Sequence, residues 1–155
     1  MASGTAVIVG VGPGLGVALV RAFAGAGHPV AMLDQDKARL GAGPAGLASG
    51  GPALRGYVTD AADPGNLRAA ISAAITELGP PGVLVYHVGV VRKDSPIGRD
   101  DQDWADGTAV RVLGARVAAN AVLPGLRDGR GSGPHYRAAA LAQAYVGLHN
   151  QPPSE

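Results

Sequence analysis

A glycine-rich turn near the N-terminus constrains the fold of this chain more than any other feature. Residues 5–10 form a short apolar run that predicts a buried parallel strand, and residues 15–23 repeat apolar side chains at helical spacing. Between them stands the string Gly10-Val11-Gly12-Pro13-Gly14-Leu15-Gly16. Glycines there let the chain turn sharply, let a pyrophosphate approach the backbone and let the helix pack close to the strand. A chain with 25 glycines also forms such strings in ordinary turns, but the position between a strand and an amphipathic helix favours phosphate binding.

Strand and helix patterns alternate from this turn to residue 126. Apolar runs at residues 29–33, 54–58 and 83–88 predict three more strands, and residues 41–53 predict a loop or a frayed helix. One helix is expected after Asp63-Pro64, and a long one from about Trp104 to residue 126, broken at Pro124 or soon after it. This alternation predicts an α/β fold: a Rossmann-like parallel sheet with strand order 3-2-1-4 and helices on both faces.

The C-terminal part departs from the alternation. We expect residues 1–133 to form the Rossmann-type dinucleotide-binding domain, and residues 134–155 to add a C-terminal helix and tail, with the helix at 138–149. The fourth strand is then an apolar edge of the sheet, and such edges tend to pair with another chain. The chain is therefore expected to form a homo-oligomer or to cover this edge with its last helix.

Composition excludes several classes of function. The formal net charge is only +1 and the basic residues are scattered, which argues against nucleic acid or a membrane surface as a partner. The absence of cysteine excludes disulfides, thiolate nucleophiles and cysteine metal sites. The aspartates between residues 100 and 106 suit a helix N-terminus, so no metal site is predicted. No apolar run approaches the roughly 20 residues of a membrane span and no secretory signal is recognisable, so a soluble cytoplasmic protein is expected.

An acidic residue closes the second predicted strand. Asp34 follows Gly16 by 18 residues, where a carboxylate can accept hydrogen bonds from both ribose hydroxyls of an adenosine and repel a 2′-phosphate. This position favours NAD over NADP as cofactor. The alternative is a solvated turn residue, because Asp36 stands close by and is typical of a turn.

Several short motifs occur together in the order typical of one family. They are Gly10-x-x-x-Gly14-x-Gly16, Thr59-Asp60 after the third predicted strand, residues 78–85 leading into the fourth, Trp104, residues 123–126 and Gly131-Ser132-Gly133. By these motifs, the chain resembles the short-chain dehydrogenase/reductase family over about residues 4–133. The resemblance implies an oxidoreductase with a nicotinamide cofactor, NAD rather than NADP given Asp34. The residues that it implies for cofactor binding are Gly10, Gly12, Gly14, Leu15, Gly16, Asp34, Thr59, Asp60, His87, Val88 and Gly89.

The departures from the family fall at its catalytic residues. His87-Val88-Gly89 replaces the family's Asn-Ala-Gly, and Arg111 stands where its catalytic Asn is expected. After Gly133 the chain continues with Pro134 instead of entering a strand that carries the catalytic Ser, and no Tyr-x-x-x-Lys pair occurs. Loss of an internal segment after Gly133 is the simplest interpretation.

Three functions stay open. The chain is an NAD-binding oxidoreductase by descent with its standard catalytic residues absent, a non-catalytic module that binds a nucleotide or a partner, or a redox-neutral enzyme of cyclase or lyase type. His87 and Arg111 are the candidates for an alternative acid–base or anion site. The competing interpretation is that His87 is a half-buried strand residue and that Arg111 is a solvated helix residue. The sequence does not indicate the substrate.

Overall fold

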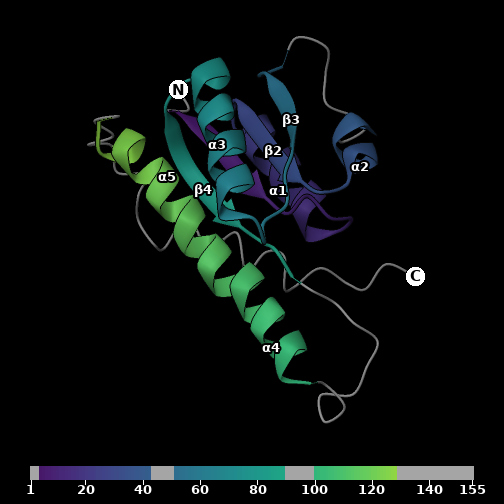
Figure 1. Cartoon of the computed structure of the whole chain (residues 1–155). Helices are drawn as coiled ribbons and strands as arrows, with labels where there is room; N and C mark the ends of the chain where they lie inside the picture. The colour runs from purple at the N-terminus through teal and green to yellow at the C-terminus, as the bar shows by residue number, and fades with distance from the viewer. Residues whose placement is uncertain (1–3, 43–50, 90–99, 129–155) are drawn as a thin grey trace, which may run out of the picture.

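The computed structural model describes residues 4–42, 51–89 and 100–128 of the chain. Within these residues, one parallel sheet lies between two layers of helices (Figure 1). In chain order the elements are β1 (Thr5–Val9), α1 (Leu15–Gly25), β2 (Val30–Asp34), α2 (Lys37–Ala42), β3 (Leu54–Val58), α3 (Pro64–Leu78), β4 (Pro81–Tyr86), α4 (Asp101–Thr108), the π-helical segment η2 (Ala109–Leu113) and α5 (Gly114–Asp128). The strand order is β3-β2-β1-β4, which confirms the prediction.

The two central strands are buried on both faces because each face carries its own helices. Alternate residues of β1 point to opposite sides: Val7 and Val9 pack with α3 and α5, whereas Ala6 and Ile8 pack with α1 and α2. All five residues of β1 and of β2 are buried, which explains why these strands appear in the sequence as continuous apolar runs. This arrangement makes the sheet a rigid base for the loops at its carboxyl edge.

The predicted strand and helix boundaries differ slightly from those observed. Asp63 caps α3 as predicted, its side chain accepting hydrogen bonds from the N–H groups of Gly65 and Asn66. The fourth strand covers Pro81–Tyr86 instead of residues 83–88. The strand ends earlier than predicted because its partner among the described strands is β1. The last residue of β1 lies opposite Tyr86, so β4 has no backbone to pair with beyond that residue.

The long helix begins three residues earlier than predicted and ends at Asp128, with Pro124 inside α5. Proline removes one backbone hydrogen bond. Tertiary packing compensates, because Ala118 and Val122 are buried against α3 and the sheet, and Gly125 fits tightly against Pro81. The π-helical segment η2 in the middle of this helix was not predicted. The expected helix at 138–149 and the rest of the predicted tail at 134–155 lie outside the described residues.

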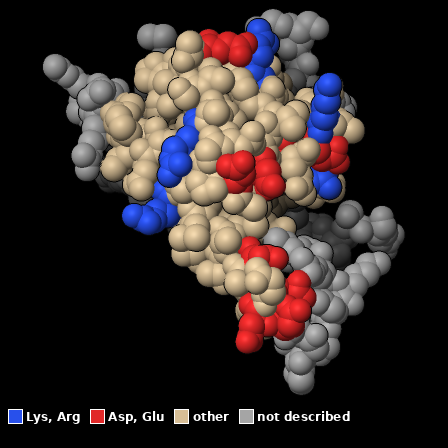
Figure 2. Space-filling view, in the orientation of Figure 1, with Lys and Arg blue, Asp and Glu red and all other residues tan. Residues whose placement is uncertain are grey.

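The aspartates of α4 serve the helix, as the sequence analysis expected. Asp100 is the N-cap, and its side chain accepts a hydrogen bond from the N–H of Asp103. Figure 2 shows acidic side chains gathered on α4, away from the sheet, and basic side chains scattered over the rest of this face.

Among the described residues no group of three or more His, Asp or Glu side chains is placed to hold a metal ion. No described helix has both the length and the apolar character needed to cross a membrane.

Candidate functional site

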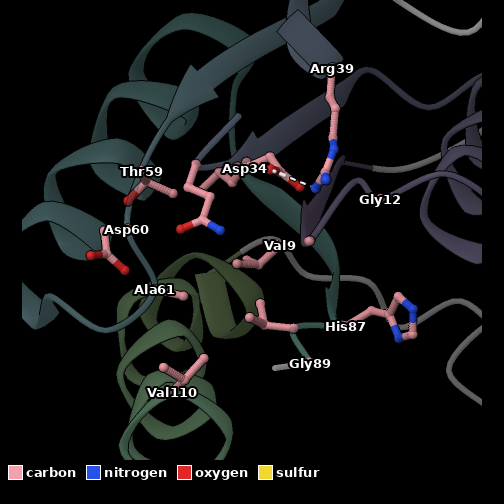
Figure 3. Close-up of a pocket in the computed structure, with 14 residues that line it drawn as sticks. Val9, Gly12, Asp34, Arg39, Thr59, Asp60, Ala61, His87, Gly89 and Val110 are labelled. Atoms are coloured by element: carbon pink, nitrogen blue, oxygen red, sulfur yellow. Dashed lines mark hydrogen bonds and ion pairs between the residues drawn. The ribbon is translucent and has the colours of Figure 1, made fainter. Parts of the chain in front are cut away.

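A cavity of about 550 Å³ opens at the carboxyl ends of all four strands (Figure 3). It lies where the strand order reverses, because the chain runs from β1 outward through β2 and β3 and then returns to the other side of β1 with β4. Open parallel sheets bind their ligands at this switch point. The lining residues are Val9, Gly10, Gly12, Leu33, Asp34, Gln35, Arg39, Thr59, Asp60, Ala61, His87, Val88, Gly89 and Val110.

Two glycines of the first turn are required by close packing. Gly10 has a φ of +95°, and a Cβ there would lie 2.2 Å from the carbonyl oxygen of His87. A Cβ on Gly16 would lie 2.6 Å from the carbonyl oxygen of Gly10. These glycines therefore bring the end of β1 against the end of β4 and hold α1 close to β1.

The other two glycines leave the first turn of α1 open. Gly14 is the N-cap, also at a φ of +95°, and makes no side-chain hydrogen bond to the helix. A Cβ on Gly12 or Gly14 would meet nothing within 4 Å, and Gly12 lines the cavity. An open helix N-terminus presents backbone N–H groups and the positive end of the helix dipole, which suits a phosphate. Leu15 and Gly16 lie in this first turn, beyond the lining residues. The turn thus fits the pyrophosphate of a dinucleotide.

Asp34 both faces the cavity and ties two loops together. Its side chain is almost buried, and its two carboxylate oxygens accept hydrogen bonds of 2.9 Å from the N–H groups of Val11 and Asp36. The guanidinium of Arg39 lies 3.5 Å from the same carboxylate and 3.2 Å from that of Asp36. Asp34 is buried, so it is not the solvated turn residue that the sequence left as the alternative, although its carboxylate also accepts the N–H of Asp36 in the turn. Arg39 was not singled out, although a basic residue five positions after the acidic one was a usable signal.

The end of β3 is held by a residue that the sequence analysis missed. The side-chain oxygen of Asn66 accepts hydrogen bonds of 2.8 Å from both the Thr59 hydroxyl and the Asp60 N–H. Asn66 is the third residue of α3, so this contact resembles the side chain that reaches back over the N-cap in a capping box. The Asp60 carboxylate also accepts from the N–H of Ala62 at 2.8 Å. Both predicted residues, Thr59 and Asp60, thereby face the cavity in fixed positions.

The two candidate catalytic residues are placed differently. His87 lines the cavity, and its N–H donates to the carbonyl of Val9 at 2.8 Å. In Figure 3 its exposed ring lies on the side of the cavity opposite Thr59. Arg111 is exposed on η2 and is not among the lining residues, whereas its neighbour Val110 is. A joint acid–base role for His87 and Arg111 stays a prediction, and no sequence signal marked Val110.

Comparisons with known proteins agree on one family. The family model described as short chain dehydrogenase matches residues 4–133. The 2-(S)-hydroxypropyl-CoM dehydrogenase 3 of Xanthobacter autotrophicus is 31% identical over 121 residues, which are 78% of this chain and 48% of that protein. L-sorbose reductase from Gluconobacter frateurii, solved with NADPH and L-sorbose, superposes with a TM-score of 0.73 at 22% identity, covering 83% of this chain and 49% of that one. A blue fluorescent protein from a metagenomic library, solved with NADPH, gives a TM-score of 0.70 at 28% identity, covering 79% and 51%. The chain thus spans about half the length of these proteins.

Proposed function

This chain belongs to the short-chain dehydrogenase family, and on that premise we propose that it binds a nicotinamide dinucleotide through the adenosine and pyrophosphate half of the molecule. The observation that carries the proposal is the open N-terminus of α1 at the switch point of the sheet, with no Cβ on Gly12 or Gly14 to fill it. The backbone of this turn would hold the pyrophosphate. Asp34, Thr59 and Asp60 would hold the adenosine.

We propose NAD as the preferred dinucleotide because the buried carboxylate of Asp34 stands where the ribose hydroxyls would bind. Arg39 acts against this preference, since its guanidinium lies beside Asp34 and can attract a 2′-phosphate. The blue fluorescent protein, at 28% identity, was solved with NADPH. Titration with NAD and NADP in parallel decides between them. Arg39→Ala is expected to weaken NADP binding and to leave NAD binding nearly unchanged, whereas tighter binding of NADP by the native chain would contradict the preference.

Calorimetric titration of the 155-residue chain with NAD tests the proposed site. Gly12→Val adds side-chain atoms to the cavity wall. Gly12 does not have a positive φ and a Cβ there would meet nothing within 4 Å, so the fold is expected to persist. Binding of NAD is expected to be lost because the new side chain would occupy the pyrophosphate position. Gly25→Val, at the other end of the same helix and also without neighbours within 4 Å, is the matched control and should bind normally. Normal binding by Gly12→Val would show that the glycine turn is only a turn.

We further propose that this chain is an oxidoreductase by descent whose carbonyl reductase activity is absent or weak. The nicotinamide ring, when bound, supplies or accepts a hydride. Carbonyl reduction also needs a proton, and a positioned acid contributes about 10²–10⁴-fold to the rate. The sequence holds no Tyr-x-x-x-Lys pair, and His87 is the histidine among the described residues that line the cavity. Imidazole side chains transfer protons near neutral pH, so residual activity should depend on His87.

Oxidation of NADH against a panel of carbonyl compounds measures this activity. His87→Ala is expected to remove any residual turnover. His28→Ala is the control, because His28 stands at the opposite end of the sheet, where its ring contacts the carbonyl of Gly4. Robust turnover that survives His87→Ala would contradict the proposal. Binding of NAD without any turnover would favour the non-catalytic module.

We propose that the chain forms a homo-oligomer through the outer edge of β4, which pairs with no second strand among the described residues. Val83, Leu84 and Val85 are only half-buried, and β4 pairs with β1 alone among the described strands. An exposed apolar edge strand is a template for pairing with a second chain. Light scattering after size-exclusion chromatography measures the mass, and a monodisperse monomer would contradict the proposal unless another part of the chain covers this edge.

A further inference from the structure

The backbone hydrogen bonding of the long helix changes at the end of η2. The N–H of Gly114 donates to the carbonyl of Ala109, five residues earlier. In an α-helix it would donate to the carbonyl of Val110, four residues earlier. The Val110 carbonyl instead accepts a hydrogen bond from the hydroxyl of Tyr86, which reaches across from β4.

Gly114 makes this contact sterically possible. A Cβ at position 114 would lie 2.1 Å from the Tyr86 hydroxyl oxygen and 2.9 Å from the carbonyl oxygen of Ala61. Any other residue would therefore push the helix away from both β4 and the loop after β3. Burial raises the pKa of Tyr86 above its ordinary value, so the hydroxyl carries its proton and is a donor at neutral pH.

The residue of the long helix that lines the cavity lies in the π-helical turn. Val110 lines the cavity near Ala61 (Figure 3), and no other described residue of α4, η2 or α5 does so. Each residue of a helix turns the chain by about 100°. A return to α-helical hydrogen bonding would shift the hydrogen-bond register by one residue and rotate Val110 relative to α5 by about that angle, out of the cavity.

We propose that Tyr86 is a positioning residue for nucleotide binding: its hydroxyl holds the π-helical turn that places Val110 against the adenine base. The inference rests on the proposed function. It concerns the adenine because the phosphates belong at the glycine turn and the ribose at Asp34, so the base extends toward Ala61 and Val110. A flat, largely apolar ring fits the methyl groups of a valine.

Tyr86→Phe removes only the hydroxyl and keeps the ring, so the fold is expected to persist. Binding of AMP, which carries adenosine and one phosphate, should weaken about tenfold, and binding of NAD by the same factor, because the lost contact belongs to the adenosine. Amide hydrogen exchange of residues 109–114 should accelerate in the same variant, with or without nucleotide. Tyr57→Phe is the matched control: it removes a tyrosine hydroxyl that donates to Glu77 on the surface and should change neither AMP binding nor exchange in η2.

A double-mutant cycle separates positioning from a general loss of stability. Val110→Ala should weaken AMP binding in the native chain and have little further effect in Tyr86→Phe, because Val110 has then already left the cavity. Additive losses, unchanged AMP affinity in Tyr86→Phe or unchanged exchange of residues 109–114 would each overturn the inference. Absence of AMP and NAD binding by the native chain would instead overturn the proposed function, and the role of Tyr86 in binding with it.

Discussion

Replacing Gly10 by alanine is expected to destabilise the fold far more than the same change at Gly14. Both glycines have a φ of +95°, which costs an L-residue about 1–3 kcal/mol. At Gly14 the new methyl group meets nothing within 4 Å, so this backbone cost is the whole effect. At Gly10 the methyl group would lie 2.2 Å from the carbonyl oxygen of His87 and must move away by about 0.8 Å to reach 3.0 Å, the closest approach that real Cβ atoms show.

That movement separates the ends of β1 and β4. Overpacking adds about 1–3 kcal/mol. Loss of the 2.8 Å hydrogen bond from the His87 N–H to the Val9 carbonyl adds about 1 kcal/mol. We therefore expect Gly10→Ala to lower the free energy of unfolding by about 3–7 kcal/mol and Gly14→Ala by about 1–3 kcal/mol. Domains of this size are stable by only about 5–15 kcal/mol, so Gly10→Ala approaches global unfolding.

Urea denaturation followed by circular dichroism measures both variants against the native chain. Equal slopes of the free energy against urea are required before the midpoints are compared. Equal losses at Gly10 and Gly14 would refute the reasoning, because they would show that the turn relaxes around the added methyl group at no further cost.

Three further predictions concern β3 and α3. Asn66→Ala should cost about 1–3 kcal/mol in urea denaturation and weaken NAD binding, since it leaves the buried hydroxyl of Thr59 without its acceptor. Burial, followed by the hydrogen bond to Glu77, raises the pKa of Tyr57 from its ordinary value of 10.0 to about 12. The protonated Tyr57 hydroxyl therefore stabilises the folded chain fully below pH 10, and this stabilisation is lost as the pH rises toward 12. Over that range the urea midpoint of the native chain should fall more steeply than the urea midpoint of Tyr57→Phe. Ile71→Ala removes a fully buried side chain between α3 and the sheet and should cost about 2–5 kcal/mol, whereas a loss below 1 kcal/mol would contradict the packing described.

The sequence by itself determined the order of the strands and the place of the candidate site. Apolar runs, helical spacing and the cap at Asp63 depend on neighbouring residues, so they are visible before folding. Once the strands are parallel, the rule that crossovers are right-handed fixes the order β3-β2-β1-β4 and brings the glycine turn, Asp34 and Asp60 to one edge. The roles of Gly10 and Gly14 in turning the chain follow from the same local chemistry.

Only the tertiary structure decided how these residues are held. The Tyr86 hydroxyl meets the carbonyl of Val110 across 24 positions of sequence, and the Asp34 carboxylate meets the N–H of Val11 across 23. Such contacts depend on how helices and strands pack. The residues next to Tyr86 and Asp34 in the sequence do not indicate them. The π-helical turn and the continuation of α5 through Pro124 have the same origin, because packing against β4 and α3 offsets what the local hydrogen bonding loses.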